Sequence, residues 1–84
     1  MKQYGEMRVL ENVPRSPESS SITTISKKID MTYSHTRDLL EILEKDGSVR
    51  SRKIGRVKLF TKTSQGFSVA YAWKRFWKKY KETI

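Results

Sequence analysis

Apolar residues recur at helical spacing in four segments of the chain, which predicts four helices. The first segment covers residues 3–12. A polar stretch with Pro14 and Pro17 follows it, and we expect a loop there because proline cannot continue a helix. A second helix is expected to carry Ile22, Ile25 and Ile29 on one face, and the other two helices are expected at residues 33–46 and 64–84.

The second and third helices are separated by three residues, Asp30 to Thr32. Asp30 suits a tight or left-handed turn, and Thr23 and Thr32 are candidates for the N-caps of the two helices. Gly47 follows the third helix, where a glycine commonly ends a helix. This part of the sequence therefore predicts a helix-turn-helix.

Between the third and fourth helices the pattern changes to bulky apolar residues interleaved with cations. It predicts strands at about 48–54 and 57–61, joined by a tight type II′-like turn at Gly55-Arg56. A chain of 84 residues has room for one hydrophobic core, so we expect a single domain over residues 1–84. The fold class is predicted to be α+β.

Charge is distributed unevenly along this chain, whose formal net charge is +9. Residues 1–46 carry seven Lys/Arg and eight Asp/Glu, whereas residues 47–81 carry eleven Lys/Arg and no acid. A basic surface this concentrated attracts polyanions and holds phosphates through counterion release. Because the basic segment begins where the predicted hairpin begins, the pattern indicates DNA binding.

Several function classes are excluded by composition and by missing motifs. The chain has no cysteine, which excludes disulfides, thiolate metal sites and cysteine nucleophiles. It has no glycine-rich phosphate loop, metal-ligand cluster or nucleophile motif, so we expect no enzyme, no metal and no cofactor, and no small-molecule ligand is evident from the residues. His35 precedes Asp38 by three residues, a pairing that is far more often incidental than catalytic on an exposed helix. No apolar run is long enough for a membrane span or a signal sequence.

The order helix, helix, helix, basic hairpin, helix resembles the winged helix-turn-helix family of DNA-binding regulators over about residues 4–62. The resemblance rests on ITTISKKIDMTYSHTRDLLEILEKDGSVRSRKIGRVKLF, in which the third predicted helix runs into Lys45-Asp46-Gly47 and then a basic hairpin. The chain departs from the family at Asp30, where glycine is usual, and at Ser48, where a bulky apolar residue is common. The resemblance implies a three-helix core, a two-stranded β wing and a long C-terminal helix.

A small, cysteine-free, lysine-rich winged helix is also similar to regulators carried by viruses and plasmids of thermophilic archaea. We therefore expect a cytoplasmic protein, in the host cytoplasm if a virus encodes it.

The resemblance further implies that the helix at 33–46 enters the major groove of duplex DNA. Arg37 is the best candidate to read a base, because arginine pairs bidentately with guanine. Asp38 and Glu41 would accept from a cytosine amine or brace Arg37. The expected base contacts are Ser34, His35, Arg37, Asp38 and Glu41, and the expected contacts to the backbone or minor groove are Thr23, Thr24, Tyr33, Arg50, Arg52, Lys53, Arg56 and Lys58.

These assignments have plainer alternatives. The charges of residues 33–46 could form only a solvated helix face, and Thr23 could be only a cap. The hairpin cations could protect an edge strand from aggregation, although this does not explain the missing acids.

The last predicted helix carries an apolar seam with spacings of 3, 4, 3 and 4 residues, widened by Phe67, Val69 and Phe76. The seam could complete the domain's own core, hold a homodimer, or lie on an anionic membrane. We favour the dimer, because a small domain gains most from burying such a seam against its own copy. The seam residues are Ala70, Trp73, Trp77, Tyr80 and Ile84.

Together these features predict a sequence-specific transcriptional regulator that binds double-stranded DNA as a homodimer and does not bind membranes. A non-specific architectural DNA-binding protein would differ in its ratio of specific to non-specific affinity. A winged-helix module for protein–protein interaction would bind DNA weakly at any salt concentration.

Overall fold

The computed structural model describes the backbone of residues 4–83 and the side chains as far as Phe76. The predicted order of four helices and a hairpin is confirmed, and a short strand, β1, precedes the second helix. The elements are α1 (Tyr4–Glu11), β1 (Ser20–Ser21), α2 (Ile22–Ile29), α3 (Tyr33–Lys45), β2 (Val49–Ile54), β3 (Val57–Lys62) and α4 (Ser64–Thr83).

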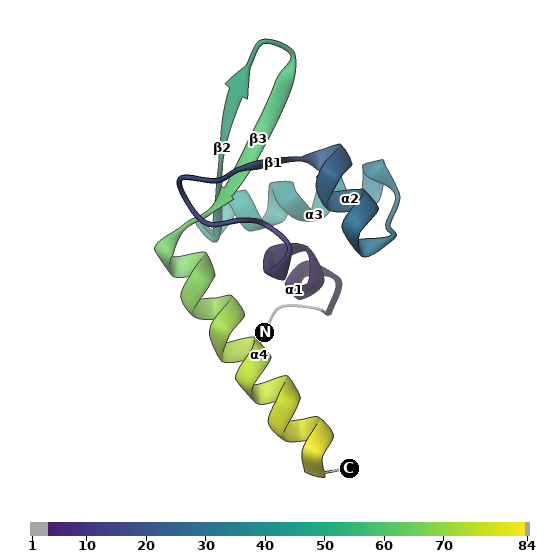
Figure 1. The fold of residues 1–84 in the computed structure, drawn as a ribbon, viewed down its shortest axis with the longest axis vertical. Coiled ribbons are helices and arrows are strands. Elements are labelled where there is room, and N and C mark those ends of the chain that lie inside the picture. The colour runs from purple at the N-terminus through teal and green to yellow at the C-terminus, as the bar shows by residue number, and fades with distance from the viewer. Residues whose placement is uncertain (1–3, 84) are drawn as a thin grey trace.

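The strands form one antiparallel sheet in the order β1-β3-β2, so the α+β class is confirmed. Ile54 pairs with Val57, which leaves Gly55 and Arg56 as a two-residue turn. Gly55 has φ +63° and Arg56 does not have a positive φ, as a type II′ turn requires. The β2–β3 hairpin projects from the helical body, and α4 extends in the opposite direction (Figure 1).

The turn between α2 and α3 forms as expected, with one change in capping. Asp30 adopts the left-handed conformation at φ +53°, and the Thr32 side chain accepts a hydrogen bond from the backbone N–H of His35 at 3.3 Å. The prediction that Thr23 caps α2 is wrong. Ser21 does so, accepting from the N–H of Thr24 at 3.2 Å, because it is the last extended residue before the helix.

The core gathers the apolar faces of α1, α2 and α3 under β2 and β3. Ser48, where the resembling family often has a bulky residue, is fully buried at the start of the hairpin. The largest fully buried side chain is Phe60 of β3. The buried hydrophobic residues are Met7, Val9, Leu10, Val13, Ile22, Ile25, Ile29, Leu39, Leu40, Leu43, Val49, Phe60 and Ala70.

The predicted loop after α1 is present and is fastened to β3. The N–H of Lys62 donates to the carbonyl of Pro14 at 2.7 Å, and the Thr61 hydroxyl donates to the carbonyl of Glu18 at 2.9 Å. The loop therefore forms a fixed wall beside the sheet. Within residues 4–83, no helix combines the length and hydrophobicity that a membrane span needs.

Candidate nucleic-acid interface

Helix α3 separates its residues into a buried and an exposed face. The buried residues are Thr36, Leu39, Leu40 and Leu43. Every residue expected to touch DNA from this helix is exposed. These residues are Tyr33, Ser34, His35, Arg37, Asp38 and Glu41.

The exposed face of α3, the start of α2 and the hairpin enclose one concave surface, a hollow of about 340 Å³. Ser34, His35, Asp38 and Thr24 are exposed but do not line this hollow, so the structure does not bring them together with the others. The predicted contacts that line it are Thr23, Tyr33, Arg37, Glu41, Arg56 and Lys58.

Two ion pairs modify the charge of this surface. An Nη of Arg37 lies 3.2 Å from Oδ1 of Asp38, so Asp38 braces Arg37 as expected. Both side chains are about half exposed, and an exposed ion pair adds at most about 1 kcal/mol to the stability of the fold. The pair holds the guanidinium at the surface without preventing it from exchanging its partner for a base or a phosphate.

The second ion pair joins the hairpin to α3. Nζ of Lys58 lies 3.6 Å from a carboxylate oxygen of Glu44, and the other oxygen accepts from the hydroxyl of Ser51. Lys58 and Ser51 belong to β3 and β2, so Glu44 holds both strands of the hairpin against the helix. Sequence reasoning missed Glu44 because this contact depends on tertiary structure.

The hairpin register divides the cations between two faces of the sheet. Lys53 pairs with Lys58, and both lie on the face that carries buried Phe60 and contacts α3. Arg52 pairs with Leu59, and Arg50 with Thr61, so these two arginines lie on the opposite face. Arg50 and Arg52, which are predicted to contact the DNA backbone or minor groove, are therefore separated by the sheet from the hollow beside α3.

The seam expected on α4 packs in part within the chain itself. Ala70 is 6% exposed and belongs to the core, which contradicts its assignment to a dimer interface. Trp73 is half-buried against the core, with its ring centroid 6.3 Å from that of Tyr4. The other seam residues, Trp77, Tyr80 and Ile84, lie outside the described side chains.

No protein-family model matches the sequence, and no curated protein is significantly similar to it. Solved structures do match. FabT from Streptococcus pneumoniae, solved in complex with DNA, gives a TM-score of 0.79 at 23% identity, over 99% of this chain and 59% of FabT. MepR, a transcription regulator of the Staphylococcus aureus multidrug efflux pump MepA, gives a TM-score of 0.83 at 17% identity, over 96% of this chain and 62% of MepR.

A third match is Sso10a-2, a DNA-binding protein from Sulfolobus solfataricus, with a TM-score of 0.80 at 18% identity over 98% of this chain and 85% of that protein. The chain has the winged helix-turn-helix fold. The β2–β3 hairpin is the wing of this fold, and α3 occupies the place of the second helix of the helix-turn-helix. The chain spans about three fifths of the length of FabT and of MepR.

Proposed function

We propose that this winged-helix protein is a transcriptional regulator that binds double-stranded DNA, with α3 in the major groove and the wing on the backbone or in the minor groove. The observation that carries the proposal is the hollow between α3 and the wing, where Arg37, Arg56 and Lys58 gather. FabT was solved with DNA, and Sso10a-2 is a DNA-binding protein, so two chains of this fold support the same function.

Within this surface, we assign base reading to Arg37 and backbone contact to Arg56. Arg37 lies on the exposed face of α3, whereas Arg56 lies at the wing tip, opposite the helix across the hollow. Arginine in the major groove discriminates guanine through two parallel hydrogen bonds, and a wing cation neutralises phosphates regardless of sequence.

The test begins with selection of bound sequences from random duplex DNA at two salt concentrations, followed by fluorescence anisotropy on the selected site. Arg37→Ala should cost roughly 1–3 kcal/mol on the selected site and much less on random DNA. Arg56→Ala should weaken both equally and reduce the salt slope by about one. Lys28→Ala is the matched control, because Lys28 is an exposed cation of α2 that does not line the hollow.

One observation favours a second candidate, an architectural protein with little sequence preference. Helix α3 carries Asp38, Glu41 and Glu44 against only two cations, so most of the basic surface belongs to the wing rather than to the base-reading helix. A selection that enriches no sequence, together with equal losses for Arg37→Ala on every duplex, would establish this second function. Weak DNA binding at any salt concentration would indicate a module for protein–protein interaction.

We also propose that α4 holds a homodimer. The helix has 20 residues, and at 1.5 Å per residue it is about 30 Å long. Its C-terminal half extends beyond the helical body (Figure 1), and Tyr71 is 56% exposed. With Ala70 in the core, the proposed contact moves to the part of the seam that starts at Trp73. In such a dimer two copies of α3 reach half-sites one or more helical turns apart, about 34 Å or a multiple of it.

A further inference from the structure

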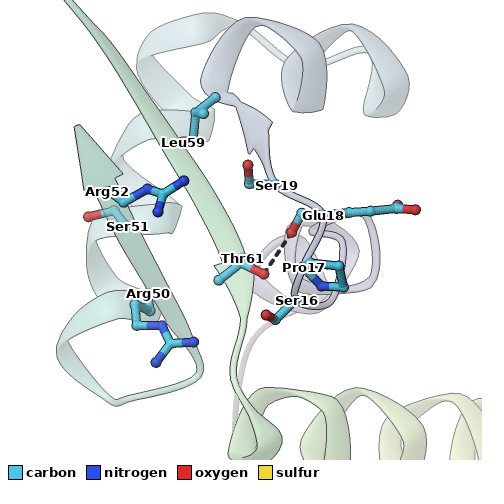
Figure 2. Close-up of a pocket in the computed structure, with 9 residues that line it drawn as sticks. All are labelled: Ser16, Pro17, Glu18, Ser19, Arg50, Ser51, Arg52, Leu59 and Thr61. Atoms are coloured by element: carbon cyan, nitrogen blue, oxygen red, sulfur yellow. Dashed lines mark hydrogen bonds between the residues drawn. The ribbon is translucent and has the colours of Figure 1, made fainter. Parts of the chain in front are cut away.

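Two adjoining hollows lie beside the sheet, the first on the face turned away from α3 and the second where β3 meets the start of α4. The first, of about 520 Å³, lies between the loop 16–19 and the wing, and Arg50, Arg52 and Leu59 line it. Figure 2 shows both arginines extending from β2 over the sheet, with Ser16 and Pro17 on the opposite side. The second hollow, of about 400 Å³, shares Ser16 and Arg50 with the first. We call the two together the back groove.

The cations of the back groove are only partly neutralised, because Glu11 acts on Lys62 without forming an ion pair. Within the described side chains, no ion pair involves Arg15, Arg50, Arg52 or Lys62. The only carboxylate beside the first hollow is that of Glu18, which points away from both arginines in Figure 2. The groove is therefore a concentration of positive charge without an acid directed into it.

Lys62 is the half-buried cation of the groove, and burial is the main influence on its pKa. Burial lowers the pKa of its ammonium group, Glu11 opposes the shift, and Lys74 and Arg15 add to it. A half-buried ammonium beside other cations gains more from an anionic ligand than a cation in water does, because the local dielectric is lower.

The groove is also preformed, because contacts within the protein hold its lining residues in place. The guanidinium of Arg15 lies 3.8 Å from the ring centroid of Phe67, which holds this cation at the second hollow. The loop wall is fixed to β3 through Pro14, Glu18 and their hydrogen bonds. The hydroxyls of Ser16 and Ser64, which line the second hollow, have no hydrogen-bond partner in the described part of the chain and are available to donate.

We propose that the back groove binds a small molecule that carries a phosphate group. The phosphate lies among Arg15, Arg50 and Lys62, where charge-assisted hydrogen bonds to a tetrahedral anion are strongest. The rest of the ligand lies in the first hollow against Pro17 and Leu59, which supply apolar surface. The two hollows fall in the size range of small-molecule sites. Arg50 lies on the face of the sheet opposite to α3, and none of these three cations lines the hollow proposed for DNA, so duplex DNA seated on α3 leaves them accessible to a ligand.

The test is isothermal titration calorimetry of the full chain at fixed ionic strength, with inorganic phosphate and with phenyl phosphate as probes. We expect saturable binding of one phosphate, tighter binding of phenyl phosphate, and a loss of roughly tenfold or more in Arg50→Gln and in Lys62→Gln. Lys28→Gln, which removes the same charge from an exposed site on α2, should bind both probes like the wild type. Far-UV circular dichroism checks that every variant is folded.

Three results would overturn the proposal. The first is a wild type that binds neither probe saturably. The second is an equal loss in Lys28→Gln, which would show attraction by net charge alone. The third is a loss of duplex affinity in Arg50→Gln as large as in Arg56→Gln, which would make the groove part of the DNA-binding surface. DNA binding and phosphate binding are measured in separate titrations. A back groove that binds no phosphate is therefore distinguishable from an α3 surface that binds no DNA.

Discussion

Replacing Gly66 by alanine tests the position of α4 on the domain. A Cβ built at Gly66 lies 1.8 Å from the carbonyl oxygen of Ser48 and 2.8 Å from its carbon, and contacts below 3.0 Å are essentially never observed. Because these are backbone atoms, no side-chain rotation relieves the clash. The first turn of α4 must withdraw by more than about 1 Å from the corner between α3 and β2.

The withdrawal of α4 also weakens hydrogen bonds to the carbonyl of Ser48, which lowers the free energy of unfolding further. Ser48 accepts from the N–H and the hydroxyl of Thr63, each at 3.1 Å, and these hydrogen bonds fix the start of α4. Overpacking of this kind costs typically 1–3 kcal/mol, and each weakened hydrogen bond adds about 1 kcal/mol. We therefore expect Gly66→Ala to lower the free energy of unfolding by about 3–5 kcal/mol.

Gly5→Ala provides a matched control, because it also places alanine in a helix that has glycine. A Cβ at Gly5 meets only Cδ1 of Leu39, at 3.6 Å, which is an ordinary contact. Helix propensity then increases stability by up to about 1 kcal/mol. Urea unfolding followed by circular dichroism should show free energies of unfolding that differ by about 3–6 kcal/mol between the two variants. If Gly66→Ala is as stable as Gly5→Ala, α4 does not pack against Ser48 and the reasoning is refuted.

Two further predictions concern titration and assembly. The lowered pKa of Lys62 means that the unfolded chain keeps this proton to higher pH than the folded chain does, so the free energy of unfolding of the wild type should rise relative to Lys62→Gln as the pH increases toward the ordinary value of 10.5. Urea titrations at neutral and alkaline pH measure this difference, and a difference that does not vary with pH contradicts it. Trp77→Glu places a charge on the distal seam and should convert a dimer into a folded monomer in sedimentation velocity experiments. A wild type that sediments as a monomer at every concentration would reject the dimer.

Local signals were sufficient to predict most of the fold. Apolar spacing located all four helices, Asp30 and Thr32 defined the turn between α2 and α3, and Gly55 defined the wing turn. Each of these features depends on residues close together in sequence. Strand β1 could not be predicted, because two serines carry no strand pattern and pair with β3 only through tertiary structure.

The candidate site was less predictable than the fold. Exposure of Arg37 and Glu41 followed from helical periodicity, but the link from Glu44 to the wing joins residues on different elements. The seam on α4 illustrates the same limit. Periodicity correctly placed Ala70 and Trp73 on one face, but it did not show that the core covers Ala70 and that Tyr4 of α1 contacts Trp73.

The basic segment from Arg50 to Lys62 shows how one continuous feature of a sequence becomes two surfaces. Side chains alternate along a strand, so the register that places Lys53 and Lys58 toward α3 places Arg50 and Arg52 on the opposite face. The alternation was visible in the sequence, but only the core contact of Phe60 shows which face meets α3. A count of cations therefore overstates the charge available to DNA on the α3 side. Single substitutions of Arg52 and of Lys53, one cation from each face, separate the contributions of the two faces to DNA affinity. A uniformly basic DNA-binding surface would lose the same affinity in both variants.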